Sequence, residues 1–292
     1  MPSENPLGVL TILDNLSAPG LLSRVQQMES LGYSSYWIPE LMGREPMATA
    51  AYLLANTETI NIATGIANVY VRAPHAMVQA RHTLGDISGD RFILGLGVSN
   101  VGLNGIRGHK WQPPVRKLSK YLNDMEAIVP TGPIAASKAP MYVAAHGPKL
   151  QMLASGRMHG VLTYLMSSAH TRLSRQRIGS SARLDVVCMM LAEKEATKAR
   201  SIAREALAYY LTLDYYHREW RALGFDDADF SDGGSDELID TLVGWGDERA
   251  LEARVEEHLE AGASRVLIMP LDLSLGGVEA STTLQALAPE KG

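Results

Sequence analysis

Short apolar runs rich in β-branched residues recur along the chain and alternate with stretches whose apolar residues fall three or four apart. The first pattern is typical of buried strands, and the second is typical of helices that bury one face. Eight strands are predicted in this way, at Val9–Leu13, Tyr36–Pro39, Ile60–Ile66, Arg91–Val98, Met141–Ala145, Val161–Leu165, Leu184–Leu191 and Val266–Met269.

The unit between the third and fourth predicted strands shows how this alternation is built. Pro74 suits the start of a helix, where its missing N–H costs nothing, and Gly89 suits the end of that helix. A crossover helix makes the two strands that it joins parallel and adjacent. Eight such repeats without a change in composition predict one α/β domain over residues 1–292, a closed (β/α)8 TIM barrel.

Two segments are longer than a simple barrel needs. One is 99–114, after the fourth predicted strand, and the other is 193–262, after the seventh. Long insertions in a compact domain are usually functional or flexible rather than parts of the scaffold. We therefore expect both insertions to contribute to the functional site.

Composition narrows the classes of function. The chain has 292 residues, is 46% hydrophobic and carries a formal net charge of −5, which gives no general reason to expect binding to nucleic acid or to an anionic membrane. Its single cysteine, Cys188, excludes an internal disulfide. The sequence has neither an apolar run of membrane-spanning length nor a signal-peptide pattern, so we expect a cytoplasmic protein. It also has no His–Glu–His spacing and no paired cysteines, so no metal site is expected.

In a TIM barrel the chemistry lies at the carboxyl ends of the strands, and the strongest signal there is the segment 144–149. A predicted strand ends and a predicted helix begins within this segment, and amides at a helix start favour an anion. The backbone N–H groups of His146, Gly147 and Lys149 are therefore predicted to bind a phosphate. From this segment alone, a tight turn around Gly147 is an equally open interpretation.

A basic stretch forms the second signal. Between Phe92 and Asn123 the chain has no Asp or Glu, but it has five basic residues, which are Arg107, Lys110, Arg116, Lys117 and Lys120. Such a rim would attract a polyanionic ligand to the mouth of the barrel. The alternative is an ordinary solvated helix face.

Glu40 is the best candidate for acid or base chemistry. It follows an apolar strand at the functional end of the barrel, where partial burial favours proton transfer with a substrate. The alternative is a structural ion pair with Arg44 or Arg72.

Four segments, taken together, resemble the luciferase-like flavin monooxygenase superfamily and, within it, the actinobacterial branch that uses the deazaflavin coenzyme F420. They are 36–40, 64–68, 84–97 and 144–148, and they occur in the order found in that superfamily. The resemblance implies an F420-dependent oxidoreductase that transfers a hydride between the deazaflavin and a small organic substrate. It also implies a homodimer as the default assembly.

The resemblance also implies roles for individual residues. The segment Thr64–Asn68 would form a bulge behind the deazaflavin ring, with a cis peptide between Gly65 and Ile66. The loop after the fourth strand would contact the ring or its ribityl chain, and the segment 144–149 would hold the cofactor phosphate. The cofactor-binding residues implied in this way are Thr64, Gly65, Ile66, Asn68, Asn100, Asn104, Ala144, Ala145, His146, Gly147, Lys149, Thr163 and Tyr164, and Glu40 falls where relatives place an acid or base.

Two other functions remain open on the same barrel. One is an FMN-dependent monooxygenase that activates oxygen and receives electrons from a separate flavin reductase. The other is a non-catalytic member of the family that only binds the cofactor. The basic stretch favours F420, because the glutamate tail of F420 adds carboxylates to the phosphate that FMN also carries.

Overall fold

The strands of this protein form a single parallel sheet that closes on itself. The computed structural model describes residues 5–273 and 281–289. The strands in these ranges are β1 (Leu7–Leu10), β2 (Ser35–Ile38), β3 (Asn61–Thr64), β4 (Ala67–Asn68), β5 (Phe92–Gly97), β6 (Met141–Ala144), β7 (Gly160–Tyr164), β8 (Arg183–Leu191), β9 (Val243–Trp245) and β10 (Arg265–Pro270). Because β10 pairs with both β1 and β8, eight strands close a barrel, and the predicted TIM barrel is confirmed.

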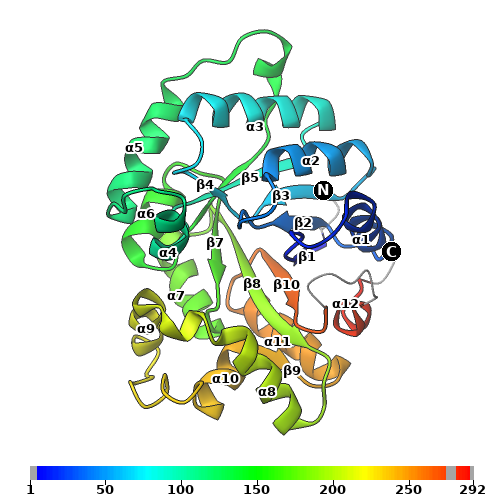
Figure 1. Ribbon diagram of the computed structural model, residues 1–292, viewed down its shortest axis with the longest axis vertical. Helices are drawn as coiled ribbons and strands as arrows, with labels where there is room; N and C mark the ends of the chain where they lie inside the picture. The colour runs from blue at the N-terminus through cyan, green and yellow to red at the C-terminus, as the bar shows by residue number, and fades with distance from the viewer. Residues whose placement is uncertain (1–4, 274–280, 290–292) are drawn as a thin grey trace.

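Helices surround the barrel and connect its strands (Figure 1). They are α1 (Ala18–Ser30), α2 (Pro46–Ala55), α3 (Pro74–Ser88), α4 (Val101–Ile106), α5 (Pro114–Glu126), α6 (Pro148–Ser155), α7 (Ser168–Ile178), α8 (Ala196–Leu207), α9 (Asp214–Arg221), α10 (Asp236–Leu242), α11 (Glu248–Glu260) and α12 (Thr282–Ala286), with 3-10 helices η1 (Pro133–Ala136) and η2 (Tyr210–Thr212). Pro74 opens α3 as predicted, and Gly89 ends it in the left-handed conformation that favours glycine.

The structure differs from the prediction at two strands. The first strand lies at Leu7–Leu10, not at Val9–Leu13, because its pairing with β10 runs from Leu7 to Val9 and the chain leaves the barrel after Leu10. The second insertion contains β9, which sequence patterning did not predict. β9 pairs with the last three residues of β8, where that strand extends beyond its pairing with β7.

Apolar residues fill the molecule in three clusters. One lies inside the barrel and includes Trp37 and Tyr142, whose ring centroids are 5.5 Å apart with their planes nearly perpendicular. The largest lies between the barrel and its helices. The third, which includes Trp220 and Leu238, packs the second insertion onto the ends of β7 and β8. The second insertion is therefore part of the folded body and is held by apolar burial.

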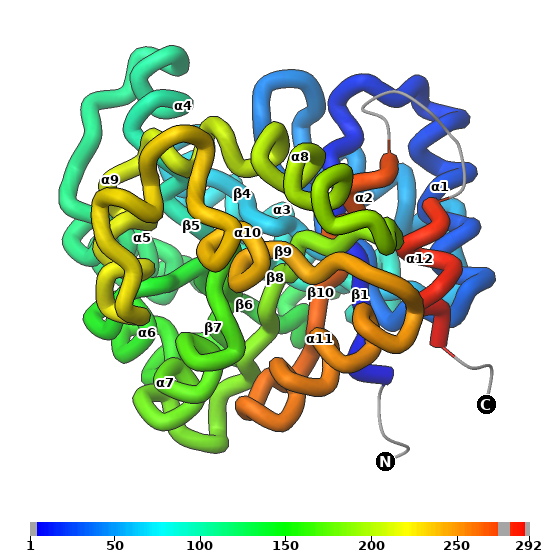
Figure 2. The backbone as a smooth tube through the Cα atoms, turned by 90° about the horizontal axis from the view of Figure 1, so that it is seen from below, coloured from blue at the N-terminus to red at the C-terminus, as the bar shows by residue number. Residues whose placement is uncertain are grey.

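The second insertion covers one side of the barrel. In Figure 1 the helices α8, α9 and α10 lie together at the lower end of the molecule, and in Figure 2, which views the molecule from that side, they lie in front of the strands. This layer supplies one wall of the cavity described below. Within the described residues, helices are too short or too polar to cross a membrane.

Candidate functional site

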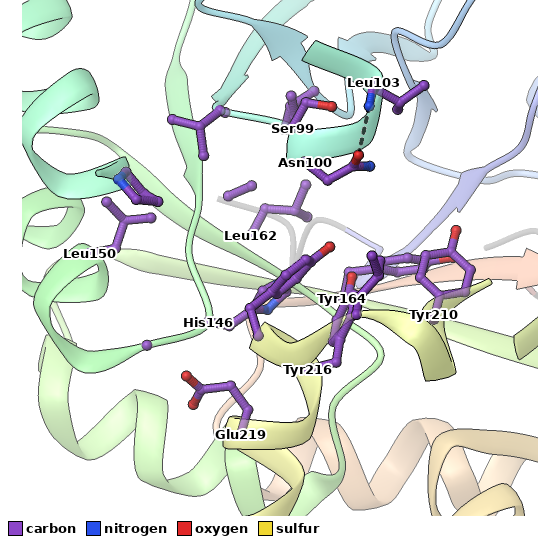
Figure 3. A pocket seen from close by; sticks show the side chains of 18 of the residues that line it. Ser99, Asn100, Leu103, His146, Leu150, Leu162, Tyr164, Tyr210, Tyr216 and Glu219 are labelled. Carbon is purple, nitrogen blue, oxygen red and sulfur yellow. Dashed lines mark hydrogen bonds between the residues drawn. The ribbon is translucent and has the colours of Figure 1, made fainter. Parts of the chain in front are cut away.

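A cavity of about 1300 Å³ opens at the carboxyl ends of the barrel strands. Residues in or directly after all eight barrel strands line it, and both insertions contribute further walls. Figure 3 shows Asn100 and Leu103 of the first insertion on one side of the cavity and Tyr210 and Tyr216 of the second insertion on the other. This is the position and size expected for a large ligand in a TIM barrel.

One wall of the cavity is formed by Ile66. The peptide between Gly65 and Ile66 is cis, as the resemblance implies. A Cβ atom at Gly97 of β5 would lie 2.7 Å from Cγ1 of Ile66, and one at Gly95 would overlap the carbonyl oxygen of Thr64. The two glycines of β5 therefore make room for the bulge that carries the Ile66 side chain.

The segment 144–149 forms one end of the cavity, at the start of α6. Gly147 is the N-cap residue of α6, and its φ of −79° is accessible to any residue, so no special backbone angle requires the glycine. The backbone N–H groups of His146, Gly147 and Lys149 have no hydrogen-bond acceptor among the described residues. Free amides at the start of a helix can bind an anion, and a glycine lets the anion approach closely.

Buried polar side chains hold this segment in place. Gln151 donates to the hydroxyl of Ser174 (2.8 Å), and Ser174 lies 3.2 Å from Nδ1 of His170. Nε2 of His170 lies 3.1 Å from the carbonyl oxygen of His146, so His170 carries its proton on Nε2 and donates there. This network fixes the backbone that would contact the anion.

His146 itself is held neutral. Burial, and secondly the neighbouring His170, lowers its pKa to about 3. Its Nδ1 atom is buried and has no hydrogen-bond partner among the described residues, although the residue lines the cavity. A neutral imidazole with an unused nitrogen can accept or donate a hydrogen bond to a ligand, which is consistent with a binding role.

An acidic residue lies beside the proposed phosphate position. A Cβ atom built on Gly147 would lie 3.2 Å from Oε1 of Glu219, which comes from α9. Burial raises the pKa of Glu219, while the guanidinium groups of Arg177 and Arg218 oppose that rise. Lys149 and Arg218 line the same end of the cavity, so cationic and anionic groups meet there.

Glu40 lies at the opposite wall, behind the tip of β2. Its Oε2 atom accepts a hydrogen bond from the backbone N–H of Asn68 (2.8 Å) and forms an ion pair with Arg72 (2.7 Å). Arg72 also pairs with Glu45; burial lowers the Arg72 pKa, but these two carboxylates together raise it above its ordinary value. Both bonds that Glu40 accepts from the described residues go to Oε2, so Oε1 is left for a ligand in the cavity.

The two insertions meet over the cavity. Asn100 caps the start of α4, where its Oδ1 atom accepts the N–H of Leu103 (2.9 Å). The same oxygen accepts a hydrogen bond from the hydroxyl of Tyr209, next to η2 (3.2 Å). The contact ties the first insertion to the second.

The structure brings most of the predicted site residues to one cavity. The predicted residues that line it are Glu40, Gly65, Ile66, Asn100, Ala144, His146, Gly147, Lys149 and Tyr164. The predicted residues that are buried behind the lining are Thr64, Asn68, Asn104, Ala145 and Thr163.

The residues behind the lining hold parts of the wall together. Thr64 exchanges two hydrogen bonds with the backbone of Gly95. Asn68 donates to the side chain of Asn104 (2.9 Å), and Asn104 donates to the carbonyl oxygen of Asn100 (3.0 Å). Contact between these side chains and a cofactor therefore stays a prediction, whereas their contacts with the wall are direct.

The five residues of the basic stretch do not form a rim around the cavity. Arg107 donates to the carbonyl oxygen of Leu41, Lys117 lies 4.4 Å from the ring centroid of Tyr70, and Lys120 pairs with Asp124. None of the five predicted basic residues lines the cavity. Three of them are thus engaged with neighbouring groups of the described chain.

Sequence reasoning missed much of the second insertion's contribution. The lining residues that it did not single out include Tyr210, Tyr215, Tyr216, Arg218, Glu219 and Arg221. They are more than 90 residues away from the loops after the second and fourth strands, so no local spacing connects them to those loops. Two Tyr-Tyr pairs, at 209–210 and 215–216, are the signal in the sequence that marks this segment as unusual.

The chain is similar to known proteins in sequence and in fold. A 5,10-methylenetetrahydromethanopterin reductase of Methanolobus tindarius is 25% identical in an alignment 283 positions long, which covers 82% of this chain and 86% of that protein. The structure of coenzyme F420 dependent tetrahydromethanopterin reductase from Methanopyrus kandleri superposes with a TM-score of 0.72 at 16% identity, covering 98% of this chain and 97% of that chain. The oxygenating constituent of 3,6-diketocamphane monooxygenase from Pseudomonas putida, in complex with FMN, superposes with a TM-score of 0.68 at 15% identity, covering 97% of each chain.

These structural similarities, all at low identity, show the shared fold. The sequence model of one family, described as luciferase-like monooxygenase, matches residues 14–265. Because this match covers most of the chain, the protein belongs to the luciferase-like monooxygenase family.

Proposed function

We propose that this protein is an F420-dependent oxidoreductase that transfers a hydride between the deazaflavin and a small organic substrate. The observation that carries the proposal is a single cavity of about 1300 Å³ in which the Ile66 wall and the free amides at the start of α6 face the same space. A tricyclic ring with a phosphorylated side chain needs an apolar wall for the ring and an anion site for the phosphate.

The residues present fit such a cofactor. Ile66 would support the ring, and the N–H groups of His146, Gly147 and Lys149 would hold the phosphate, with the unused Nδ1 of His146 beside them. A side chain at Gly147 would occupy the approach to these amides, and the glycine leaves it open. When bound, F420 would supply the hydride chemistry.

The protein's own contribution would be orientation and proton transfer. Glu40 lines the cavity, and its Oε1 atom accepts no hydrogen bond from the described residues, so this oxygen would exchange a proton with a substrate. The ion pair with Arg72 fixes the position of this carboxylate. In this proposal Glu40 combines the ion pair with Arg72 and the acid or base role, the two roles that its sequence position left open.

Two observations favour F420 over FMN. The relative with 25% identity is a methanopterin reductase, and the related reductase whose structure superposes on this chain is named as F420-dependent. Lys149, Arg218 and Arg221 also line the cavity, which suits a ligand with carboxylates beyond its phosphate. FMN is the second candidate. The Pseudomonas putida monooxygenase, which superposes on this chain over 97% of each chain, is a complex with FMN.

Turnover with each cofactor tests the proposal. Purified protein would be mixed with reduced F420 and a panel of aldehydes, ketones, enones and imines, and oxidation of F420 would be followed by its absorbance. We expect substrate-dependent oxidation without oxygen consumption. Oxygen consumption with reduced FMN and no reaction with reduced F420 would support the monooxygenase instead, and binding of F420 without turnover on the panel would support a non-catalytic member.

A further inference from the structure

Four tyrosines form a continuous wall on the side of the cavity that the second insertion supplies. This tyrosine wall comprises Tyr164 at the end of β7, Tyr210 in η2, and Tyr215 and Tyr216 in α9, and all four line the cavity. The ring centroids of Tyr164 and Tyr210 are 5.4 Å apart, those of Tyr210 and Tyr216 are 5.7 Å apart, and both pairs meet edge to face. Figure 3 shows Tyr164, Tyr210 and Tyr216 grouped opposite Asn100.

At the Tyr164 end of the tyrosine wall the barrel strands supply apolar side chains. Tyr164 packs with Leu162, Val187 and Met269, and all three line the cavity. The charged lining residues lie further along α9, where Asp214, Arg218 and Arg221 are exposed and Arg221 pairs with Asp227. A charged ligand group against Tyr164 and these apolar neighbours would lose water without gaining an ionic partner from them.

One hydroxyl of the tyrosine wall has a proton to donate. The hydroxyl of Tyr164 donates to that of Tyr210 at 2.8 Å and lies 3.4 Å from the sulfur of Met269. Because Tyr210 accepts this bond, its own O–H remains available to a ligand. Burial raises the pKa of both tyrosines, so both are protonated at neutral pH.

We propose that the tyrosine wall is the substrate subsite, that it takes an uncharged, flat and largely apolar molecule, and that a carbonyl or hydroxyl oxygen of this molecule accepts a hydrogen bond from Tyr210. Tyrosine faces and edges favour flat apolar groups, and a buried O–H without an acceptor costs free energy that an oxygen on the ligand removes. The redox role of this substrate rests on the proposed function, whereas the binding selectivity does not.

Three flat probes of equal size test the preference for an uncharged ligand and the hydrogen bond from Tyr210 separately. They are 2-acetylnaphthalene, which is uncharged and carries a carbonyl, 2-isopropenylnaphthalene, which lacks the oxygen, and 2-naphthoate, which is an anion. Each would be titrated into the purified full chain by calorimetry, with and without bound F420. We expect the ketone to bind at least about tenfold more tightly than the naphthoate, because the carboxylate would be desolvated without a cationic partner.

Tyr210→Phe isolates the hydrogen bond. Loss of one neutral hydrogen bond, about 0.5–1.5 kcal/mol, should weaken the ketone about 2- to 13-fold and leave the affinity of 2-isopropenylnaphthalene unchanged. Tyr52→Phe is the matched control, because it removes the hydroxyl of an exposed tyrosine in α2 that does not line the cavity. It should change neither affinity. Thermal unfolding of both variants checks that they are folded.

Three results would overturn the inference. They are no binding of the ketone up to its solubility limit, naphthoate binding as tight as that of the ketone, and an equal effect of Tyr210→Phe on the ketone and the hydrocarbon. Titration of F420 and FMN into the same proteins keeps the two proposals apart. Selective ketone binding without cofactor binding would contradict the proposed function alone, and cofactor binding without ketone selectivity would contradict this inference alone.

Discussion

Replacement of Glu40 by glutamine tests whether its carboxylate acts on a substrate or only holds Arg72. The change keeps the size of the side chain and an oxygen that can accept the N–H of Asn68, but it removes the charge that pairs with Arg72 at 2.7 Å. Arg72 is not left alone, because it also pairs with Glu45. The protein should therefore stay folded.

The magnitude follows from these contacts. Loss of one charge-assisted hydrogen bond at a buried carboxylate costs about 1.5–3 kcal/mol, and we expect the lower part of this range because Glu45 still neutralises Arg72. Loss of a general acid or base lowers turnover about 10²- to 10⁴-fold. The two effects are separable, since a modest loss of stability leaves the protein folded at assay temperature.

Glu45→Gln is the matched control. It removes a carboxylate from the same arginine, but Glu45 is half exposed and does not line the cavity. Urea unfolding would measure the stability of both variants, and oxidation of reduced F420 by an identified substrate would measure turnover. We expect a large loss of turnover in Glu40→Gln and a change of less than about threefold in Glu45→Gln, the effect of a half-exposed ion pair. Equal losses of turnover in both variants, or full turnover in Glu40→Gln, would show that Glu40 only holds Arg72 in place.

Three further predictions concern the phosphate end and the buried histidines. Gly147→Val should keep the protein folded, since the added Cβ would meet only the flexible end of Glu219. It should weaken the binding of F420 and of FMN at least about tenfold, as measured by calorimetry. Unchanged affinity in a folded variant would place the phosphate elsewhere. Glu219 has a raised pKa and, when ionised, repels a phosphate. The affinity for the cofactor should therefore increase as the pH falls through the pKa of Glu219. At a pH above that pKa, Glu219→Gln should bind the cofactor about tenfold more tightly than the wild type does. A pH profile shared by Glu219→Gln and the wild type would exclude this repulsion. Burial lowers the pKa of His170 to about 4 and those of His146 and His258 to about 3, so all three stay neutral in the folded protein while the unfolded chain takes up protons below about pH 6.5. The free energy of unfolding should therefore fall by roughly 5–6 kcal/mol between pH 7 and pH 5, and equal urea midpoints at the two pH values would contradict it.

The barrel was predictable because each of its strands is a short, largely apolar run that stands apart from its neighbours in the sequence. Central parallel strands are buried on both faces, so they are apolar at nearly every position and stand out without alternation. β9 was not predictable for the opposite reason. Val243–Trp245 has three residues with a glycine in the middle, and it forms a strand only because β8 extends far enough to pair with it.

The site was predictable where function depends on backbone geometry next to a strand. The segment 144–149 and the Gly65–Ile66 pair carry their signal locally, as a strand end beside a glycine. Which residue fills the space beside a glycine is not visible in the local sequence. Gly95 and Gly97 look like ordinary strand glycines in the sequence, and only the structure shows that they accommodate Thr64 and Ile66.

Contacts between distant segments account for the rest of the site. The tyrosine wall joins β7 to residues about 46–52 positions later along the chain, and the tie between Asn100 and Tyr209 spans 109 positions. The partner of Glu40 is similar, because Arg44 and Arg72 were equally open in the sequence and the fold selects Arg72. Such pairings depend on how the insertions pack, which a single sequence does not state.

Equilibrium titration of F420 and of FMN into the purified full chain is the measurement on which the cofactor assignment depends most directly. Calorimetry gives the stoichiometry and the two affinities in one experiment, without knowledge of the substrate. We predict one F420 per chain, bound more tightly than FMN, with an affinity that falls as salt screens the cations lining the cavity. Binding of neither cofactor, or of FMN alone, would contradict the assignment.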